Sequence, residues 1–441
     1  MSVMATNPLD QSSAMAAGSV SADTRTAARL LPYGHRPLSL GEHLTVHGPP
    51  AYSGGPGRLI DRVRQAGLTG RGGAGFPTHR KMAAVLEASG TAVAVANGAE
   101  GEPASAKDKT LLYADPHLVL DGLQVAAEAV GADRAYVYVH RDKRLLDRIH
   151  HALAQRISAG ADRVPVTVVA APPRFLAGQE SALVHRIEGG PAIPRYAPRR
   201  VVEQGIGGAP TLVQNIETLA QIALIARHGP DWFRSVGAPG EAGTMLATIH
   251  LAGSPPQVVE VPLGTPLAPL LDLGRRPARA VLVGGYHGTW LAPDQAAGLS
   301  LAAAALRPAG ASLGAGVLAA LPPDRCGLRE MARVLNYLAA ESAGQCGPCL
   351  NGLPRIAHAF AALARPAPAP GLREDVERWA GLVTGRGACH HPDGSVRLVR
   401  SALTVFVGEL RLHADGHCTG SNWAPFFPLP ALPPRHDEDW S

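Results

Sequence analysis

Apolar residues in the first half of the chain follow two alternating patterns, which predict alternating strands and helices. Short, almost continuous apolar runs are typical of buried strands, whereas longer segments such as 116–132 repeat apolar residues every three or four positions, as helices do. The strand-like runs lie at residues 91–97, 134–140 and 164–170. This alternation indicates an α/β fold with a partly parallel sheet, which we place at residues 51–240.

The pattern changes twice after residue 240. Residues 241–312 contain short strands, turns and one short helix, which predicts a small β-rich module. Residues 313–415 carry helical apolar stripes and predict a C-terminal helical bundle. The stripes are Met331, Val334, Leu335 and Leu338 in one helix, and Val399, Leu403, Phe406 and Leu410 in another. We expect residues 1–50 to be a flexible tail and lead-in, and the Pro-rich residues 416–441 a loose C-terminal tail.

The composition is that of a globular protein, since 46% of the 441 residues are hydrophobic and 17% are charged. A net charge of +5 is too small at this length to indicate a nucleic-acid partner. The N-terminus lacks the basic and apolar regions of a signal peptide, and no apolar run reaches about 18 residues. We therefore expect a cytoplasmic protein without direct membrane insertion, whose five cysteines stay reduced.

A glycine-rich stretch, GRGGAG at Gly70–Gly75, fits the G-x-G-x-x-G pattern of dinucleotide-binding loops. A Rossmann fold requires a strand before this loop, whereas the pattern predicts a helix there, so a standard Rossmann fold is excluded. Without side chains, the backbone N–H groups of such a loop can still approach an anion. The stretch alone leaves two interpretations open: an anion-binding loop, or a tight turn between helices.

A charged loop follows the first predicted strand and is the second candidate site. It carries Asn97, Glu100, Glu102, Lys107, Asp108 and Lys109. Loops that leave the ends of parallel strands are where α/β proteins bind ligands. A solvated charged loop is the alternative.

Together, GLTGRGGAGFPTHRKM and ANGAEGEPASAKDK resemble the flavin-site motifs of the NADH-oxidising subunit of bacterial complex I and its relatives in NAD-linked hydrogenases and formate dehydrogenases. Two later segments, FLAGQESALVHRIEGGPAIPR and GAPTLVQNIETLAQI, resemble further flavin-site segments in the same order. The β-rich module resembles the family's ubiquitin-like β-grasp domain, which binds soluble ligands, and the last helices resemble its iron–sulfur bundle. The resemblance is collinear over about residues 50–415.

This resemblance implies FMN and NAD(H) in one cavity of the α/β domain. Hydride would pass from the nicotinamide to FMN, and single electrons would then pass to a [4Fe–4S] cluster and a protein partner. Lys81, Glu102 and Glu180 would act in catalysis at the dinucleotide. The cofactor-binding positions that the resemblance implies are Gly70, Arg71, Gly72, Gly73, Ala74, Gly75, Phe76, Lys81, Asn97, Glu100, Glu102, Phe175, Gly178, Gln179, Glu180, Val213, Gln214, Asn215 and Thr218.

The chain departs from the family pattern at several of these positions. The family usually has an acid at Ala99, and it has Glu, Tyr and Asn where this chain has Gln179, Phe175 and Gln214. At two positions near the adenine the family has aromatic residues, whereas this chain has Ala84 and Arg200. The lost stacking faces should weaken dinucleotide binding, since an aromatic contact contributes roughly 0.5–1.5 kcal/mol beyond its area, although Arg200 could supply a cation–π or phosphate contact.

The cysteines match the family's cluster motif at three of four positions. Cys346, Cys349 and Cys389 stand where ligands are expected, and Ala343 stands where the first cysteine would be. Three interpretations stay open: a cluster on three thiolates, a cluster with a substitute ligand, or a lost cluster. The substitute ligands we consider are His390, His391 and Cys418. Zinc is disfavoured for this triad because it lies in a predicted helical bundle, and Cys326 lies outside the pattern and is expected to be buried.

The sequence therefore predicts an NADH dehydrogenase-type oxidoreductase that works with a second subunit or a ferredoxin. It would reach a quinone only through partners, peripherally to any membrane. The alternative is a relative that keeps the fold and serves as an electron relay or an assembly scaffold without oxidising NADH.

Overall fold

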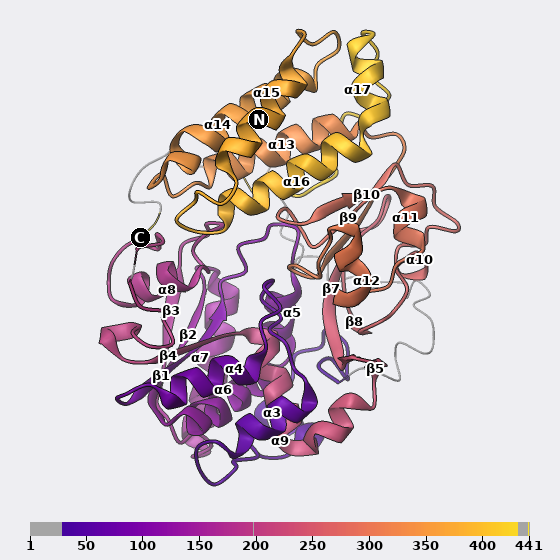
Figure 1. Ribbon diagram of the computed structural model, residues 1–441. Coiled ribbons are helices and arrows are strands. Elements are labelled where there is room, and N and C mark those ends of the chain that lie inside the picture. The colour runs from indigo at the N-terminus through magenta and orange to yellow at the C-terminus, as the bar shows by residue number, and fades with distance from the viewer. Residues whose placement is uncertain (1–28, 197, 431–439, 441) are drawn as a thin grey trace.

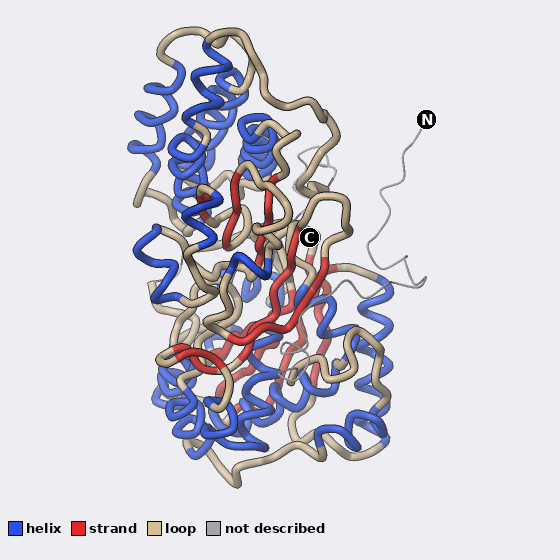
Figure 2. The backbone as a smooth tube through the Cα atoms, turned by 90° about the vertical axis from the view of Figure 1, so that its right-hand side faces the viewer, coloured by secondary structure: helices blue, strands red, loops and turns tan. Residues whose placement is uncertain are grey.

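The computed structural model describes residues 29–196, 198–430 and 440. Figure 1 shows an α/β domain at the bottom, a β-rich module at its right and a bundle of helices above both. Figure 2 shows the strands in the middle of the molecule, with helices gathered at both ends. The mixed α/β fold and the helical C-terminal region agree with the sequence prediction.

The α/β domain is built on a four-stranded parallel sheet in the order β3-β2-β1-β4. The strands are β1 (Ala92–Gly98), β2 (Ala132–His140), β3 (Val166–Ala171) and β4 (Thr211–Asn215). The helices of this domain are α3 (Arg58–Ala66), α4 (Thr78–Glu87), α5 (Lys107–Ala114), α6 (Pro116–Val130), α7 (Lys143–Ser158), α8 (Glu180–Ile187) and α9 (Ile216–Arg234), with a short η2 (Ile206–Gly208). The predicted alternation of strands and helices is thus confirmed.

Helices α6 and α9 form the main helix pair of this domain. A Cβ atom on Gly122 of α6 would lie 1.9 Å from the carbonyl oxygen of Leu219 in α9, so only glycine allows this approach. Nearly every residue of α6 is buried, because its other sides face the sheet and neighbouring helices. The domain therefore has a rigid core beneath the strand ends.

The β-rich module contains a five-stranded mixed sheet in the order β10-β9-β11-β7-β8. Its strands are β7 (Thr244–His250), β8 (Gln257–Pro262), β9 (Ala280–Val283), β10 (Thr289–Leu291) and β11 (Val317–Leu321), accompanied by the hairpin of β5 (Gly237–Ala238) and β6 (Glu241–Ala242) and by α10 (Leu267–Leu270), α11 (Pro293–Ala297), α12 (Ala303–Leu306) and η3 (Arg307–Ala309). Strand β11 lies beyond the expected module end at residue 312, because it pairs with β7 and β9 inside the sheet.

The C-terminal bundle consists of α13 (Gly327–Ala340), α14 (Leu353–Leu363), α15 (Leu372–Val383), α16 (His391–Val405) and α17 (Val407–Ala414). Both predicted apolar stripes are buried in one core. A π-helical turn, η4 (Pro348–Gly352), precedes α14 and contains Cys349. Such turns widen the helix locally and are frequent at functional sites.

Both ends of the chain are more ordered than expected where they are described. Residues 1–28 lie outside the described residues, but 29–50 pack on the α/β domain and include α2 (Leu40–His47), whose first turn has a Ser39–Glu42 capping box. Residues 418–428 are held along α13, and Phe427 is fully buried. No helix among the described residues is long and apolar enough to cross a bilayer.

Candidate functional site

A cavity of about 850 Å³ lies where the three parts of the molecule meet. It is bordered by the glycine loop, the charged loop, the start of α9, the loop after β9 and the start of α16. The predicted site residues that line it are Gly70, Arg71, Gly72, Gly73, Ala74, Gly75, Asn97, Glu100, Glu102, Phe175, Gly178 and Asn215. Segments that are far apart in sequence therefore form a single concave site.

The glycine loop lies between two helices, α3 and α4, as predicted, so it is not part of a Rossmann unit. Gly73 adopts a φ of 110°, which favours glycine, and it forms a bridge to Gly314 of the β-rich module. A Cβ atom on Gly72 would lie 3.2 Å from Cβ of Asn215. The loop thus exposes backbone, rather than side chains, to the cavity.

Arg71 helps to hold this loop in place. Its backbone N–H donates to Oγ1 of Thr218 at 2.9 Å, and its guanidinium donates to the carbonyl of Thr244 at 3.3 Å. Nε lies 3.8 Å from a carboxylate oxygen of Glu217, which is fully buried. Thr218 therefore contributes by fixing the loop backbone, and its side chain does not line the cavity.

Glu100 closes the N-terminus of α5. Its carboxylate accepts backbone N–H groups of Asp108 at 3.2 Å and Lys109 at 3.3 Å, and the hydroxyl of Ser105. Burial raises the pKa of Glu100, and the nearby Asp108 carboxylate raises it further. The carboxylate orders the charged loop around the cavity.

Glu102 joins the α/β domain to the β-rich module. One carboxylate oxygen accepts the N–H of Tyr286 at 2.7 Å, and the other accepts the N–H of Ala104 at 3.1 Å. Burial raises the pKa of Glu102 to about 7 despite these hydrogen bonds. A Cβ atom on Gly285 would lie 2.5 Å from this carboxylate, so the neighbouring turn requires glycine.

A buried charged network lies at the cavity floor, and it adds Glu217 to residues that the sequence had singled out. Nζ of Lys107 lies 2.7 Å from Asp108 and 3.0 Å from Glu217, and these carboxylates raise its pKa against the effect of burial. Asn215 donates to Asp108 at 2.6 Å while its Oδ1 caps α9. Lys107 and Asp108 stand in the charged loop that the sequence singled out, but only the fold brings Glu217 to them.

The loop before α8 interlocks with the charged loop. Asn97 donates to the carbonyl of Gly178 at 2.8 Å, and a Cβ atom on Gly178 would lie 2.5 Å from the carbonyl oxygen of Ala99. Gln179 caps α8 by accepting the N–H groups of the next turn. This close backbone contact fixes the distance between the two loops.

Lys81 and Glu180 form an ion pair beside these loops, from α4 and the first turn of α8. Both side chains are partly exposed, so a ligand can reach them. Neither residue belongs to the lining of the cavity.

Several other predicted residues also lie off the cavity. Phe76 is 51% exposed, Ala84 packs against the domain core, and Arg200 pairs with Glu203 on the surface. Val213 and Gln214 do not line the cavity because their side chains are buried in β4.

The cluster cysteines lie at the end of the bundle that faces the α/β domain. Burial raises the pKa of Cys349 to about 11, and the thiols of Cys346 and Cys389 are close enough to raise it further. His390 is exposed, and His391 uses Nε2 on the carbonyl of Leu338 at 2.8 Å. Both ring nitrogens of His391 therefore have other partners, whereas His390 is exposed beside Cys389.

An aromatic and imidazole cluster connects the cavity wall to the bundle. The rings of Phe175 and His287 lie 4.7 Å apart, and those of Phe175 and His391 5.6 Å apart. Nε2 of His287 is 3.1 Å from Nδ1 of His391. Burial lowers the pKa of both imidazoles, and that of His391 falls to about 4, so both stay neutral near pH 7.

The chain matches two family models, the Nuo51 FMN-binding domain over residues 63–224 and the NADH-ubiquinone oxidoreductase-F iron–sulfur binding region over residues 329–413. It is 31% identical over 382 residues to the NADH-quinone oxidoreductase-F protein of Streptomyces coelicolor, covering 82% of this chain and 84% of that protein. The chain belongs to the NADH-quinone oxidoreductase-F family. Its members are oxidoreductases of the NADH dehydrogenase type.

Two further matches agree with this assignment. A second member of the NADH-quinone oxidoreductase-F family, from Rhizobium meliloti, is 29% identical, covering 82% of this chain and 89% of that protein. Among solved structures, an NAD⁺-reducing [NiFe]-hydrogenase in the air-oxidised state matches with a TM-score of 0.76 and 29% identity, covering 89% of this chain and 69% of that chain. These comparisons give no support to the alternative of a relay or scaffold.

The described residues fit the cofactors of the NADH-quinone oxidoreductase-F family. The glycine loop presents backbone to the cavity, and the charged loop and the loop before α8 pack so closely at Gly178 that a Cβ atom there would meet backbone, so these segments leave room for a flat, polar ligand. Cys346, Cys349 and Cys389 offer the soft sulfur ligands that iron–sulfur clusters use. The cavity is therefore suited to FMN, and the three thiols are suited to a cluster.

Proposed function

We propose that this chain is the electron-input flavoprotein of an NADH-oxidising complex, with the cavity as the shared site for FMN and NADH. The observation that carries the proposal is the cavity itself, which joins the glycine loop, the charged loop and the approach to the cysteine triad. When bound, FMN supplies the exchange between hydride transfer and single-electron transfer. The protein supplies position, charge and exclusion of water.

The proposed roles of the side chains follow from their contacts. Backbone N–H groups of Gly70–Gly75 bind the anionic parts of the ligands, and Asn97 and Glu100 hold the loop that faces the flavin. When the ligands bind, the ion pair between Lys81 and Glu180 breaks. Lys81 then contacts a phosphate or the flavin, and Glu180 binds a ribose hydroxyl. Glu102 sets the position of the β-rich module at the cavity rim.

The proposed cluster site uses three protein thiolates, Cys346, Cys349 and Cys389, with one iron bound by a ligand from outside the protein. Ala343 offers no donor atom, and the two imidazoles beside Cys389 are committed elsewhere or exposed. Phe175 and His287 line the cavity and contact His391, two residues after Cys389, so these rings would lie along the route between bound FMN and a bound cluster.

We also propose that the β-rich module is a ubiquitin-like β-grasp domain. Its first and last strands, β7 and β11, are parallel neighbours at the centre of the sheet, flanked by two antiparallel pairs, which supports this topology. Thiolate ligands require a reducing compartment, so we place the protein in the cytoplasm. Its electron acceptor is a second subunit or a ferredoxin.

An anaerobic titration tests the function. Protein reconstituted with FMN should show flavin absorbance, and NADH should bleach that absorbance at the concentrations that reduce the cluster. A folded preparation that retains no FMN would remove the flavoprotein assignment. Retained FMN that millimolar NADH and NADPH leave oxidised would remove the dehydrogenase assignment.

The role of Lys81 has a matched test. Lys81→Met should weaken NADH or FMN binding about tenfold or more, because a charge-assisted contact contributes roughly 1.5–3 kcal/mol. Lys143→Met is the control, since Lys143 is exposed and pairs with Asp147 on α7, away from the cavity. Dissociation constants from flavin fluorescence check both variants, and equal binding by the two would assign Lys81 no role at the site.

A further inference from the structure

A second group of sulfur and nitrogen ligands lies at the opposite end of α13 from the cluster cysteines. Cys326 precedes the first residue of α13, whereas Cys346 and Cys349 follow its last residue. A helix of 14 residues is about 21 Å long. The two groups are therefore separate, and Cys418 belongs to the group at Cys326, so it is not a substitute ligand for the cluster.

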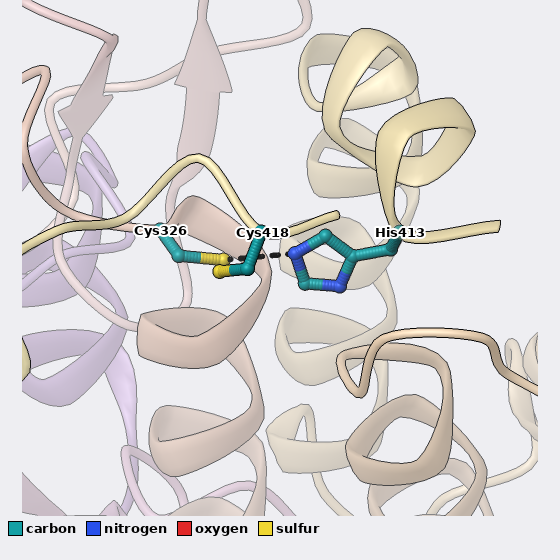
Figure 3. A group of neighbouring side chains, drawn as sticks. All are labelled: Cys326, His413 and Cys418. Atoms are coloured by element: carbon teal, nitrogen blue, oxygen red, sulfur yellow. Dashed lines mark hydrogen bonds between the residues drawn. The ribbon is translucent and has the colours of Figure 1, made fainter. Parts of the chain in front are cut away.

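Three side chains from three segments converge there. Cys326, His413 of α17 and Cys418 place their ligand atoms within 4.8 Å of one another. Figure 3 shows the two sulfurs side by side and the imidazole of His413 facing Sγ of Cys326, which lies 3.5 Å from Nε2 of His413. Zinc bound to sulfur at ~2.3 Å and nitrogen at ~2.0 Å in tetrahedral geometry separates those atoms by about 3.5 Å.

The site is enclosed by protein on most sides. Cys326 and His413 are buried, and Cys418 is half-buried. A Cβ atom on Gly420 would lie 2.9 Å from Cβ of Cys326, so the chain after Cys418 passes directly over this cysteine. The exposed side of Cys418 leaves a fourth position that water can fill.

The other group of possible metal ligands among the described residues differs in its hydrogen bonds. His43, His47 and Asp115 are also close together, but both ring nitrogens of His43 are occupied, by Asp115 at 2.9 Å and by Asp121 at 2.8 Å. In that group His43 is held between two carboxylates in a buried network of ion pairs. At Cys326 the sulfur and imidazole atoms face one another, and two sulfurs with one imidazole nitrogen form a ligand set that suits zinc.

We propose that Cys326, His413 and Cys418 bind a zinc ion, whose fourth ligand is water. The ion ties the segment after Cys418 to the bundle. That segment runs along α13, where the N–H of Asn422 donates to the carbonyl of Asp324 at 3.0 Å, and it ends at Tyr286, which donates to the carbonyl of Pro428 at 2.6 Å. Zinc binding therefore stabilises the junction between the bundle and the β-rich module near the cavity.

Metal analysis of the anaerobically purified wild-type protein tests this. We expect about one zinc ion per chain, with a zinc-edge X-ray spectrum of two sulfur ligands and one imidazole. Cys418→Ser and His413→Gln should each reduce zinc to near zero and abolish the rise in Tm with added zinc. Cys389→Ser is the matched control, because it should lower iron and leave zinc unchanged.

Three results would overturn the proposal. These are wild-type protein without zinc, zinc retained in both Cys418→Ser and His413→Gln, and a Cys326–Cys418 disulfide in freshly purified anaerobic protein. The spectrum of wild-type protein decides the ligand set even if a variant fails to fold. Zinc content is measured independently of FMN and NADH, so a failed zinc test is distinct from a failed function test.

Discussion

At the scale of single residues, Glu102 shows how a site residue also serves the fold. Its carboxylate accepts two backbone N–H groups across the junction with the β-rich module, yet burial raises its pKa from 4.5 to about 7. The folded state therefore holds a proton between these pH values that the unfolded chain releases. Stability from this group is complete below pH 4.5 and is lost as the pH rises to about 7.

The raised pKa of Glu102 predicts how stability depends on pH. The side chain of Glu102→Gln cannot ionise. The free energy of unfolding of this variant, relative to that of wild type, should therefore rise by about 3 kcal/mol between pH 4.5 and pH 8. Denaturant unfolding at several pH values measures the difference. The control is Glu87→Gln, because Glu87 is exposed on α4. A difference between wild type and Glu102→Gln that stays constant with pH would contradict the prediction.

Ala343 is the other informative residue, because it stands where a fourth thiolate would complete the cluster site. Ala343→Cys should hold a cluster that loses iron more slowly in air than the wild-type cluster does, since every iron then has a thiolate ligand. Iron and acid-labile sulfide contents over time provide the measurement. Iron-free protein in both forms would show that the thiols no longer bind a cluster.

At the scale of elements, the loops that carry the site are positioned by backbone contacts. A Cβ atom on Gly101 would lie 2.2 Å from the carbonyl oxygen of Phe175, so the charged loop and the loop before α8 touch without side chains between them. The distance between these loops sets the width of the cavity on this side.

Gly101→Ala should therefore force the loops apart, lower the free energy of unfolding by about 1–3 kcal/mol and weaken FMN retention. Gly381→Ala is the control: nothing lies within 4 Å of its added Cβ atom in α15, and alanine should stabilise that helix by about 0.5–1 kcal/mol. Thermal unfolding and flavin content measure both variants. Full flavin retention in Gly101→Ala would show that the loop contact is dispensable.

At the scale of the whole molecule, the segment after Cys418 joins two parts that the sequence treats as separate. Phe427 is fully buried against Tyr286 and Trp290 of the β-rich module, and its N–H donates to Glu330 of α13. This segment thus holds the bundle on the module that borders the cavity.

Phe427→Ala should lower the free energy of unfolding by about 3–5 kcal/mol, because it leaves a cavity in a buried aromatic cluster. Phe426→Ala, next to it and only partly buried, should cost less than half as much. Denaturant unfolding compares the two. Equal losses would show that the segment packs no more tightly at Phe427 than at its neighbour.

The sequence by itself determined the order of strands and helices, the absence of a Rossmann unit at the glycine loop, and the cysteine spacing at Cys346, Cys349 and Cys389. Those features are local, because short segments of sequence determine backbone preference, the periodicity of apolar residues and the spacing of ligands. The expectation that the glycine loop and the charged loop share one cavity came from the resemblance of their motifs to the family's flavin-site motifs.

Only the tertiary structure decided which distant residues meet. Packing brought Glu217 to Lys107, Phe175 to His287, β11 into the sheet, and Cys418 to Cys326 instead of to the cluster cysteines. No local pattern encodes these contacts, because they depend on how buried apolar surfaces from separate segments fit together.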